Sequence, residues 1–161
     1  MTQEKSTMRR LSALLISIWL GVHIGFGIAA YNIFSKLSHL SDGKILAGNI
    51  AGVLFSIVNW FGLLAWLLVF IIARQDNQRR SYGKSRIPAW TIVLLVLIAV
   101  NQFLFSPVIA ALKTQQSNWL HSLIGGGFGM WHGLSYVIYM IAGLVGLGLC
   151  IRLLRLDEQR Y

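Results

Sequence analysis

The chain has little charge, a single cysteine and few acidic residues. Only 12% of its 161 residues are charged, against roughly a quarter in an average soluble domain. Cys150 is the only cysteine, which excludes an internal disulfide and any CxxC redox or zinc motif. The composition therefore excludes a soluble enzyme and a disulfide-stabilised secreted domain.

Carboxylates and recognisable catalytic motifs are missing from the apolar segments. The acidic residues all fall in the tails or the links: Glu4, Asp42, Asp76, Asp157 and Glu158. A proton pump or an intramembrane aspartyl protease needs such groups within its spans. The sequence also contains no HExxH or GxSxG motif, so it shows no machinery for hydrolysis. We therefore lean towards a protein that is not an enzyme.

Hydrophobic residues make up 56% of the chain and gather in four long stretches. Each stretch exceeds the ~20 residues that a helix needs to cross the hydrocarbon core of a bilayer. Short polar links join them, which is typical of an up-down-up-down bundle. The sequence predicts an all-α, integral membrane four-helix bundle in one domain over residues 1–161, with spans Leu11–Phe34, Ile45–Ala73, Ile87–Leu112 and Phe128–Leu154.

The positive charges lie mostly on one side of these spans. The net charge of +9 would indicate nucleic-acid binding in a soluble protein. Here the positions of Lys and Arg between the spans predict the orientation of the helices in the membrane instead. We expect no nucleic-acid partner. Because Lys and Arg favour the cytoplasmic side, we expect both termini in the cytoplasm. Three basic residues fall on the other side (Lys36, Lys44 and Lys113) and eleven on the cytoplasmic side (Lys5, Arg9, Arg10, Arg74, Arg79, Arg80, Lys84, Arg86, Arg152, Arg155 and Arg160).

The first span resembles a signal peptide but is longer than one. Signal peptides have apolar regions of about 7–15 residues, and Leu11–Tyr31 has 21, so we expect an uncleaved first helix. Aromatic side chains favour membrane interfaces. We therefore place Trp90 at the inner interface and Tyr31, Trp119 and Trp131 at the outer one.

Several polar side chains interrupt the apolar spans. At ~1.5 Å per residue, His23, Asn59, Asn101 and Gln102 fall at a similar depth, just outside the midplane. Such side chains commonly form interhelical hydrogen bonds, worth about 0.6 kcal/mol each. The alternative is that these four residues, with His132 nearer the outer boundary, form a layer that binds a ligand or cofactor.

The histidines raise the possibility of a metal or a haem. All four lie in the outer half or the outer links, and Met130 precedes His132 by two residues. Imidazole with thioether suits copper, and imidazole alone suits haem iron or zinc. The candidate metal ligands are His23, Met130 and His132, whose spacing matches no ligand motif.

Small residues and turn signals complete the pattern. Three GxxxG pairs (Gly21/Gly25, Gly48/Gly52 and Gly129/Gly133) predict close helix packing within the bundle, with self-association as the alternative. Pro107 predicts a kink or an end of the third helix after Ser106. The apolar positions Trp119, Leu120, Leu123 and Ile124 predict a short surface helix, and Gly125–Gly127 a hinge.

Short motifs along most of the chain resemble a known family. They are Trp19-Leu20-Gly21, Ala30–Phe34, Ala47-Gly48, Gly52, Phe55, Gly62 and His132-Gly133-Leu134-Ser135. The chain resembles the bacterial members of domain of unknown function 4149, which is akin to transmembrane protein 205. It departs from them at Tyr31, where relatives usually have proline. The resemblance implies a small multi-pass protein of the bacterial inner membrane with no established reaction.

Two functional hypotheses remain at this stage. The first is a membrane protein without catalytic machinery, acting alone or as an accessory or structural subunit of a larger membrane complex in the lipid bilayer. The second is a copper- or haem-handling protein that uses the outer-half histidines. A looser likeness to copper-resistance inner-membrane proteins and to the four-helix protoporphyrinogen oxidase accompanies the second.

Overall fold

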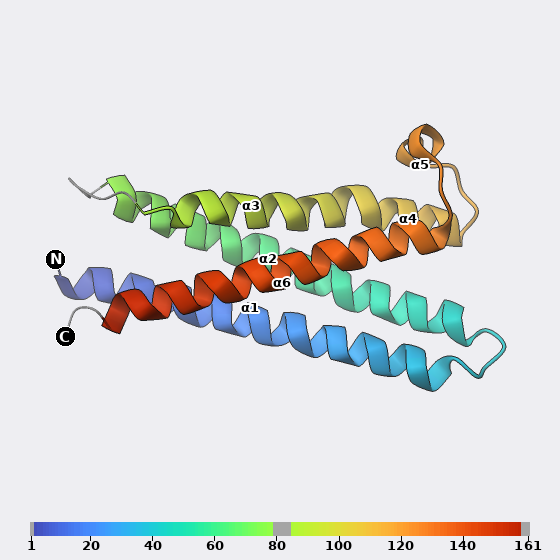
Figure 1. Ribbon diagram of the computed structural model, residues 1–161, viewed down its shortest axis with the longest axis horizontal. Helices are drawn as coiled ribbons and strands as arrows, with labels where there is room; N and C mark the ends of the chain where they lie inside the picture. Colours follow the sequence, from blue (N-terminus) through green and yellow to red (C-terminus); the bar gives the residue numbers. More distant parts are fainter. Residues whose placement is uncertain (1, 79–84, 159–161) are drawn as a thin grey trace.

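The computed structural model describes residues 2–78 and 85–158, with side chains described for 10–78 and 85–153. Six α-helices and one π-helical segment follow one another along these residues (Figure 1). They are α1 (Thr2–Leu37), α2 (Gly43–Gln78), α3 (Ile87–Val100), η1 (Asn101–Phe105), α4 (Ser106–Lys113), α5 (Trp119–Ile124) and α6 (Phe128–Glu158).

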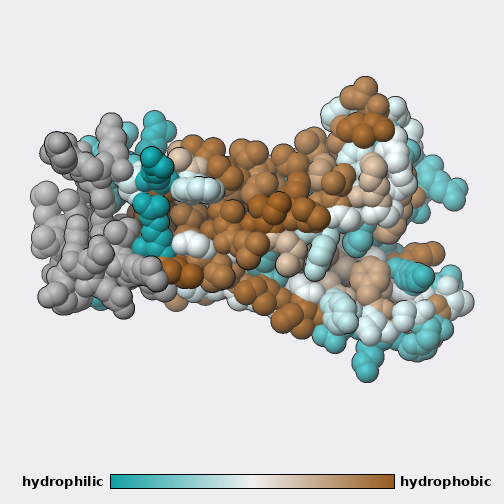
Figure 2. Space-filling view, viewed as in Figure 1, coloured by the Kyte–Doolittle hydropathy of each residue, from teal (hydrophilic) through white to brown (hydrophobic). Residues whose placement is uncertain are grey.

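Four helical segments are long and apolar enough to cross a membrane. They are Arg10–Leu37, Gly43–Gln78, Ile87–Lys113 and Phe128–Leu153. The predicted all-α fold with four apolar spans is thus confirmed. Figure 2 shows hydrophobic side chains over the middle of the visible face, as expected of a surface that contacts lipid.

The four long segments form a closed ring in cross-section. Helix α1 packs against α2 and α6, and α3 packs against the same two helices on the other side. Both chain termini lie at one end of the bundle, here called the terminal end, and α5 lies at the other, here called the α5 end (Figure 1). Of the basic residues expected at the terminal end, Lys5, Arg9, Arg79, Arg80, Lys84, Arg155 and Arg160 lie outside the residues whose side chains are described.

Two tryptophans fill the centre of the bundle where glycines leave room for them. Trp19 and Trp66 are 1% and 0% exposed, and their rings meet edge to face with centroids 5.3 Å apart. A Cβ atom on Gly62 of α2 would lie 2.6 Å from Trp19 Nε1, and one on Gly146 of α6 would lie 2.6 Å from Trp19 Cζ3. The Trp19 indole therefore occupies space between α2 and α6 that only glycine leaves free.

Two of the three GxxxG pairs predicted to pack the bundle do not do so. A Cβ on Gly21, Gly25, Gly129 or Gly133 would have no atom within 4 Å among the described residues. In the third pair, Gly48 is buried against the Lys113 side chain and the Phe34 ring of α1, and Gly52 faces the Lys113 ammonium. The prediction of bundle packing is wrong for Gly21/Gly25 and Gly129/Gly133, because a spacing of four places two glycines on one face without saying which face is buried.

The α5 end confirms the predicted short helix and hinge. Helix α5 spans Trp119–Ile124, and the Asn118 side chain caps it by accepting hydrogen bonds from the backbone of Leu120 and His121. Gly125 and Gly126 then take φ values of +75° and +87°, which glycine adopts without strain. Trp131, predicted at the outer interface, is 1% exposed at this end of the bundle, and its Nε1 donates to the Gly125 carbonyl oxygen.

The third helical span does not end at Pro107. The helix widens to a π-helix at η1 and continues as α4 to Lys113. The Ser106 amide donates to the Asn101 carbonyl, five residues back. Proline has no N–H to donate to the preceding turn, and the wider turn before it accommodates this loss.

We expect Gly146→Ala to destabilise the protein by about 1–3 kcal/mol, because the added methyl group overlaps the buried Trp19 ring. Gly148→Ala is the matched control, since a Cβ there has nothing within 4 Å and both changes favour the helix equally. The measurement is unfolding in mixed micelles with increasing denaturing detergent. Equal stability of the two variants would contradict the packing described here.

Candidate functional site

A pair of reciprocal hydrogen bonds joins α1 to α6 in the middle of the bundle. His23 Nε2 bonds to the Tyr139 carbonyl oxygen at 3.1 Å, and the Tyr139 hydroxyl donates to the His23 carbonyl oxygen. The two rings stack with centroids 3.7 Å apart and an interplanar angle of 9°. Both residues are buried, at 4% and 5% exposure. We call this arrangement the His23–Tyr139 clasp.

Glycines on both helices make room for the clasp. A Cβ on Gly143 would lie 3.0 Å from His23 Nε2, and one on Gly27 would lie 3.6 Å from Tyr139 Cε1. Trp19, one turn before His23, tilts against the imidazole with centroids 4.7 Å apart. The imidazole is therefore held between a phenol, an indole and a glycine backbone.

The hydrogen bonds define which nitrogen of His23 carries the proton. A carbonyl oxygen only accepts hydrogen bonds, so Nε2 must be the protonated nitrogen of the neutral ring. Nδ1 is then an acceptor. It is buried and has no hydrogen-bond partner among the described residues. A buried polar atom without a partner is costly, and the indole nitrogens of Trp19 and Trp66 are in the same state among the described residues.

A lipid-facing groove of about 380 Å³ runs along the clasp between α1 and α6. Its α1 wall extends from Leu20 to Tyr31 and its α6 wall from Tyr136 to Leu147, with His23 and Tyr139 among the lining residues. The other lining residues are mostly apolar. The volume lies within the range of ligand pockets in proteins. We call it the α1–α6 groove.

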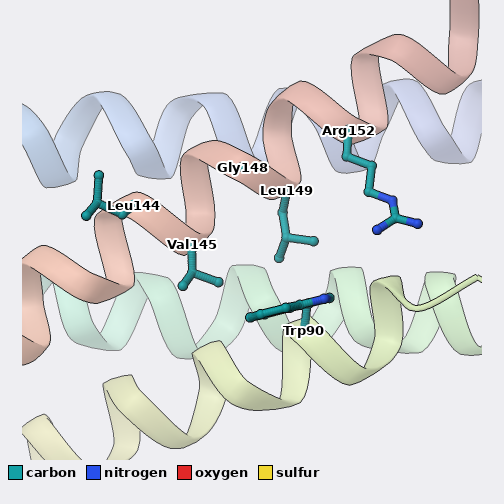
Figure 3. A pocket seen from close by; sticks show the side chains of 6 residues that line it. All are labelled: Trp90, Leu144, Val145, Gly148, Leu149 and Arg152. Atoms are coloured by element: carbon teal, nitrogen blue, oxygen red, sulfur yellow. The ribbon is translucent and has the colours of Figure 1, made fainter.

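A second groove, of about 430 Å³, lies between α3 and α6 near the terminal end (Figure 3). Trp90 of α3 faces Val145 and Leu149 of α6, and Arg152 extends beside it. None of the unpartnered buried atoms found in the described residues belongs to this lining. We call this space the α3–α6 groove.

The predicted amides pair with other helices rather than with His23. Asn59 Nδ2 donates to Gln102 Oε1 at 3.1 Å, which joins α2 to η1. Gln102 Nε2 donates to Ser56 Oγ at 3.4 Å. Asn101 Oδ1 accepts from Ser135 Oγ at 2.6 Å, which joins η1 to α6. These bonds have the form of interhelical contacts that set the register of the bundle.

His132 and Met130 lie away from His23. His132 stacks on Phe128 with centroids 5.5 Å apart, at the α5 end of α6. It precedes Tyr139 by seven residues, or about 10 Å along the helix. Met130 is 42% exposed and lies over Gly126. Among the described residues, no three His, Cys, Asp or Glu side chains form a group that could hold a metal ion.

Lys113 turns inward at the α5 end. Its ammonium donates to the Gly48 carbonyl oxygen at 2.8 Å and to Asn49 Oδ1 at 3.3 Å. Gly48 and Gly52 leave space for this side chain. The basic group thus links α4 to the first turns of α2.

Sequence reasoning missed Tyr139, Trp19 and Gly143 as parts of the site. A signal for Tyr139 was available: tyrosine favours the membrane interface, and Tyr139 lies eleven residues into a long apolar helix. A phenol at that depth needs a hydrogen-bond acceptor. Its acceptor is a backbone carbonyl on another helix, which no residue pattern indicates.

We expect Tyr139→Phe to destabilise the protein by about 0.6 kcal/mol, and at most ~1.7 kcal/mol, because it removes one interhelical hydrogen bond. Tyr136→Phe is the matched control, since Tyr136 is 52% exposed on the same helix. A double-mutant cycle of Tyr139→Leu with His23→Leu measures the coupling between the two stacked rings, because each change removes one ring and leaves both backbone carbonyls in place. Additive losses would contradict the clasp.

A family model described as Domain of unknown function (DUF4149) matches residues 14–118. The match begins within α1 and ends just before α5. It includes His23 and the three amides, and it excludes Tyr139. No curated protein and no solved structure matches the chain. Because the match covers more than half of the chain, this four-span membrane protein belongs to the DUF4149 family.

Proposed function

We propose that the protein is a non-catalytic membrane subunit that packs against another transmembrane helix through its α1 helix. The observation that carries the proposal is the exposed Gly21/Gly25 pair. A Cβ on either glycine would meet nothing within 4 Å. The pair is therefore open to a helix from another protein or from a second copy of this chain.

The pair lies in a continuous stripe along α1. Leu14, Ile18, Gly21 and Gly25 follow one another at spacings of four, three and four residues, which places them on one helix face. Leu14 and Ile18 are 58% and 48% exposed. Bilayer lipid gives helices no hydrophobic reason to associate, so association depends on close packing at small residues. Along this face of α1, the apolar side chains of Leu14 and Ile18 lie next to two glycines at which another helix can approach the backbone.

Helix α6 carries a second open pair, Gly129/Gly133, near the α5 end. Its position two turns from the clasp separates it from the α1 stripe. The Gly129/Gly133 pair forms either a second contact with the same complex or no contact. Leucine substitutions made separately in the two glycine pairs distinguish these cases.

The topology that accompanies this role has both termini in the cytoplasm of a bacterial cell and the α5 end on the outer face of the inner membrane. The support is the asymmetry of Lys and Arg in the sequence. Among residues with described side chains, Arg10, Arg74, Arg86 and Arg152 all belong to the terminal end.

We expect Gly21→Leu/Gly25→Leu to abolish association while leaving the fold intact, because the new side chains keep the partner backbone away. The measurement is native mass spectrometry after purification in mild detergent, where the wild type should exceed one 18.0 kDa chain. Gly148→Leu is the control, since Gly148 also has open space around it. A wild type that is always a lone chain, or a double variant that keeps its partner, would overturn the proposal.

We expect a fluorescent protein fused to the C-terminus to fluoresce, and alkaline phosphatase fused there to be inactive. The reason is that the basic residues keep the terminal end in the cytoplasm. Fusions after Ser41, in the link between α1 and α2, should give the opposite pair of results. Active phosphatase at the C-terminus would reverse the topology.

A further inference from the structure

From the charge and the shape of the α3–α6 groove, we propose that it binds an anionic phospholipid of the surrounding bilayer. The lipid phosphate lies against Arg152 at the terminal end, and one acyl chain lies along the groove towards the middle of the membrane. The lining of this groove includes no residue of α1, so the lipid site does not depend on the association proposed for Gly21 and Gly25.

The polar groups of the groove lie together at one of its ends. Arg152 is the one charged side chain among the described lining residues. The indole nitrogen of Trp90 lies on the side of its ring that is nearer to Arg152 (Figure 3). An indole N–H and a guanidinium both donate hydrogen bonds and accept none. The terminal end of the groove therefore presents two donors, one of them positively charged.

The rest of the groove is lined by hydrocarbon. Its α6 wall runs from Leu144 to Arg152, eight residues or about 12 Å along the helix. Gly148 lies halfway along this wall, and a Cβ added to it would have nothing within 4 Å. A hydrocarbon chain can therefore lie against α6 at Gly148, where no side chain blocks it.

The charge of Arg152 favours an anionic headgroup over other occupants. No carboxylate lines the groove among the described residues, so the guanidinium needs an anion from outside. Guanidinium binds phosphate oxygens through two parallel hydrogen bonds, and basic pockets between transmembrane helices attract acidic lipids. The phosphate of a zwitterionic lipid already has its own cation nearby. An apolar helix of another protein would cover the guanidinium without pairing it, which is costly.

The position of the polar end along the membrane agrees with this orientation of the lipid. Arg152 lies two residues before the end of the apolar stretch Phe128–Leu154, from which an arginine side chain reaches the headgroup level. Tryptophan favours the same level. Arg86, one turn before Trp90 on α3, adds a second positive charge there. A phospholipid with its phosphate at this level extends its chains towards the middle of the membrane.

The test measures quenching of Trp90 fluorescence by brominated lipids, with the full chain in phosphatidylcholine nanodiscs that contain a minor fraction of phosphatidylglycerol. The dibrominated acyl chains are carried either by the phosphatidylglycerol or by an equal fraction of the phosphatidylcholine. The quenching that belongs to Trp90 is the difference between the wild type and Trp90→Phe. We expect about fivefold enrichment of the anionic lipid at Trp90, the effect of one arginine near the membrane surface. Equal quenching by the two lipids would overturn the proposal.

Two arginines of the terminal end separate a specific site from general attraction of anionic lipid. Arg152→Gln should remove most of the enrichment at Trp90, and Arg152→Lys should keep part of it, because lysine retains the charge without the paired hydrogen bonds. Arg74→Gln is the matched control, since it removes the same charge from α2 and Arg74 does not line this groove. Equal losses in Arg152→Gln and Arg74→Gln would overturn the assignment of the headgroup to Arg152.

Two glycines of α6 test the place of the acyl chain. Gly148→Leu fills the groove and should abolish the preferential quenching, whereas Gly133→Leu, which also has open space around it, should leave it unchanged. Enrichment that persists in a folded Gly148→Leu variant would overturn the groove as the binding site. A wild-type Trp90 that neither brominated lipid quenches would mean that a protein occupies the groove, which also overturns the proposal. Gly21→Leu/Gly25→Leu should keep the enrichment, whatever its effect on association.

Discussion

The closure of this bundle depends on how α1 meets α6. Lipid tails are as apolar as the helices, so burial of hydrocarbon does not hold transmembrane helices together as it holds a soluble core. What holds these two helices is a stacked pair of rings, His23 and Tyr139, with each side chain bonded to the backbone of the other. Helix α2 contacts α1 and α3, and α3 contacts α6. The clasp joins α6 to α1 and so closes the ring of four helices. The groove, the tautomer of His23 and its unpartnered nitrogen all follow from this one contact.

Glycine has two opposite uses in this protein. Inside the bundle, Gly62 and Gly146 make room for Trp19, and Gly143 makes room for His23. On the surface, Gly21, Gly25, Gly129 and Gly133 have open space around them. Gly62, Gly143 and Gly146 belong to none of the three GxxxG pairs in the sequence, and two of those pairs face outward. The association proposed above rests on this second group.

The sequence predicted the polar residues of the spans well and their partners poorly. His23, Asn59, Asn101 and Gln102 could be selected because polar groups are rare and costly in hydrocarbon. Asn59 and Gln102 pair with each other. The remaining partners could not be selected, since they are Ser56, Ser135 and the Tyr139 carbonyl. Serine and backbone atoms occur throughout the spans and give no signal of their own. The prediction placed these residues in one layer, whereas the structure resolves them into three separate helix-to-helix contacts.

The scarcity of charge and the four apolar stretches were enough to determine a four-span membrane protein, because a helix that crosses a bilayer satisfies its backbone within itself. Whether a segment can cross the bilayer depends on its own length and composition, so the sequence of that segment is enough to predict it. Which face of each helix is buried depends on contacts between segments more than a hundred residues apart, such as His23 with Tyr139. Only the tertiary structure decided that Trp131 is buried, that Gly21 and Gly25 face outward, and that His23 and Tyr139 stack between α1 and α6.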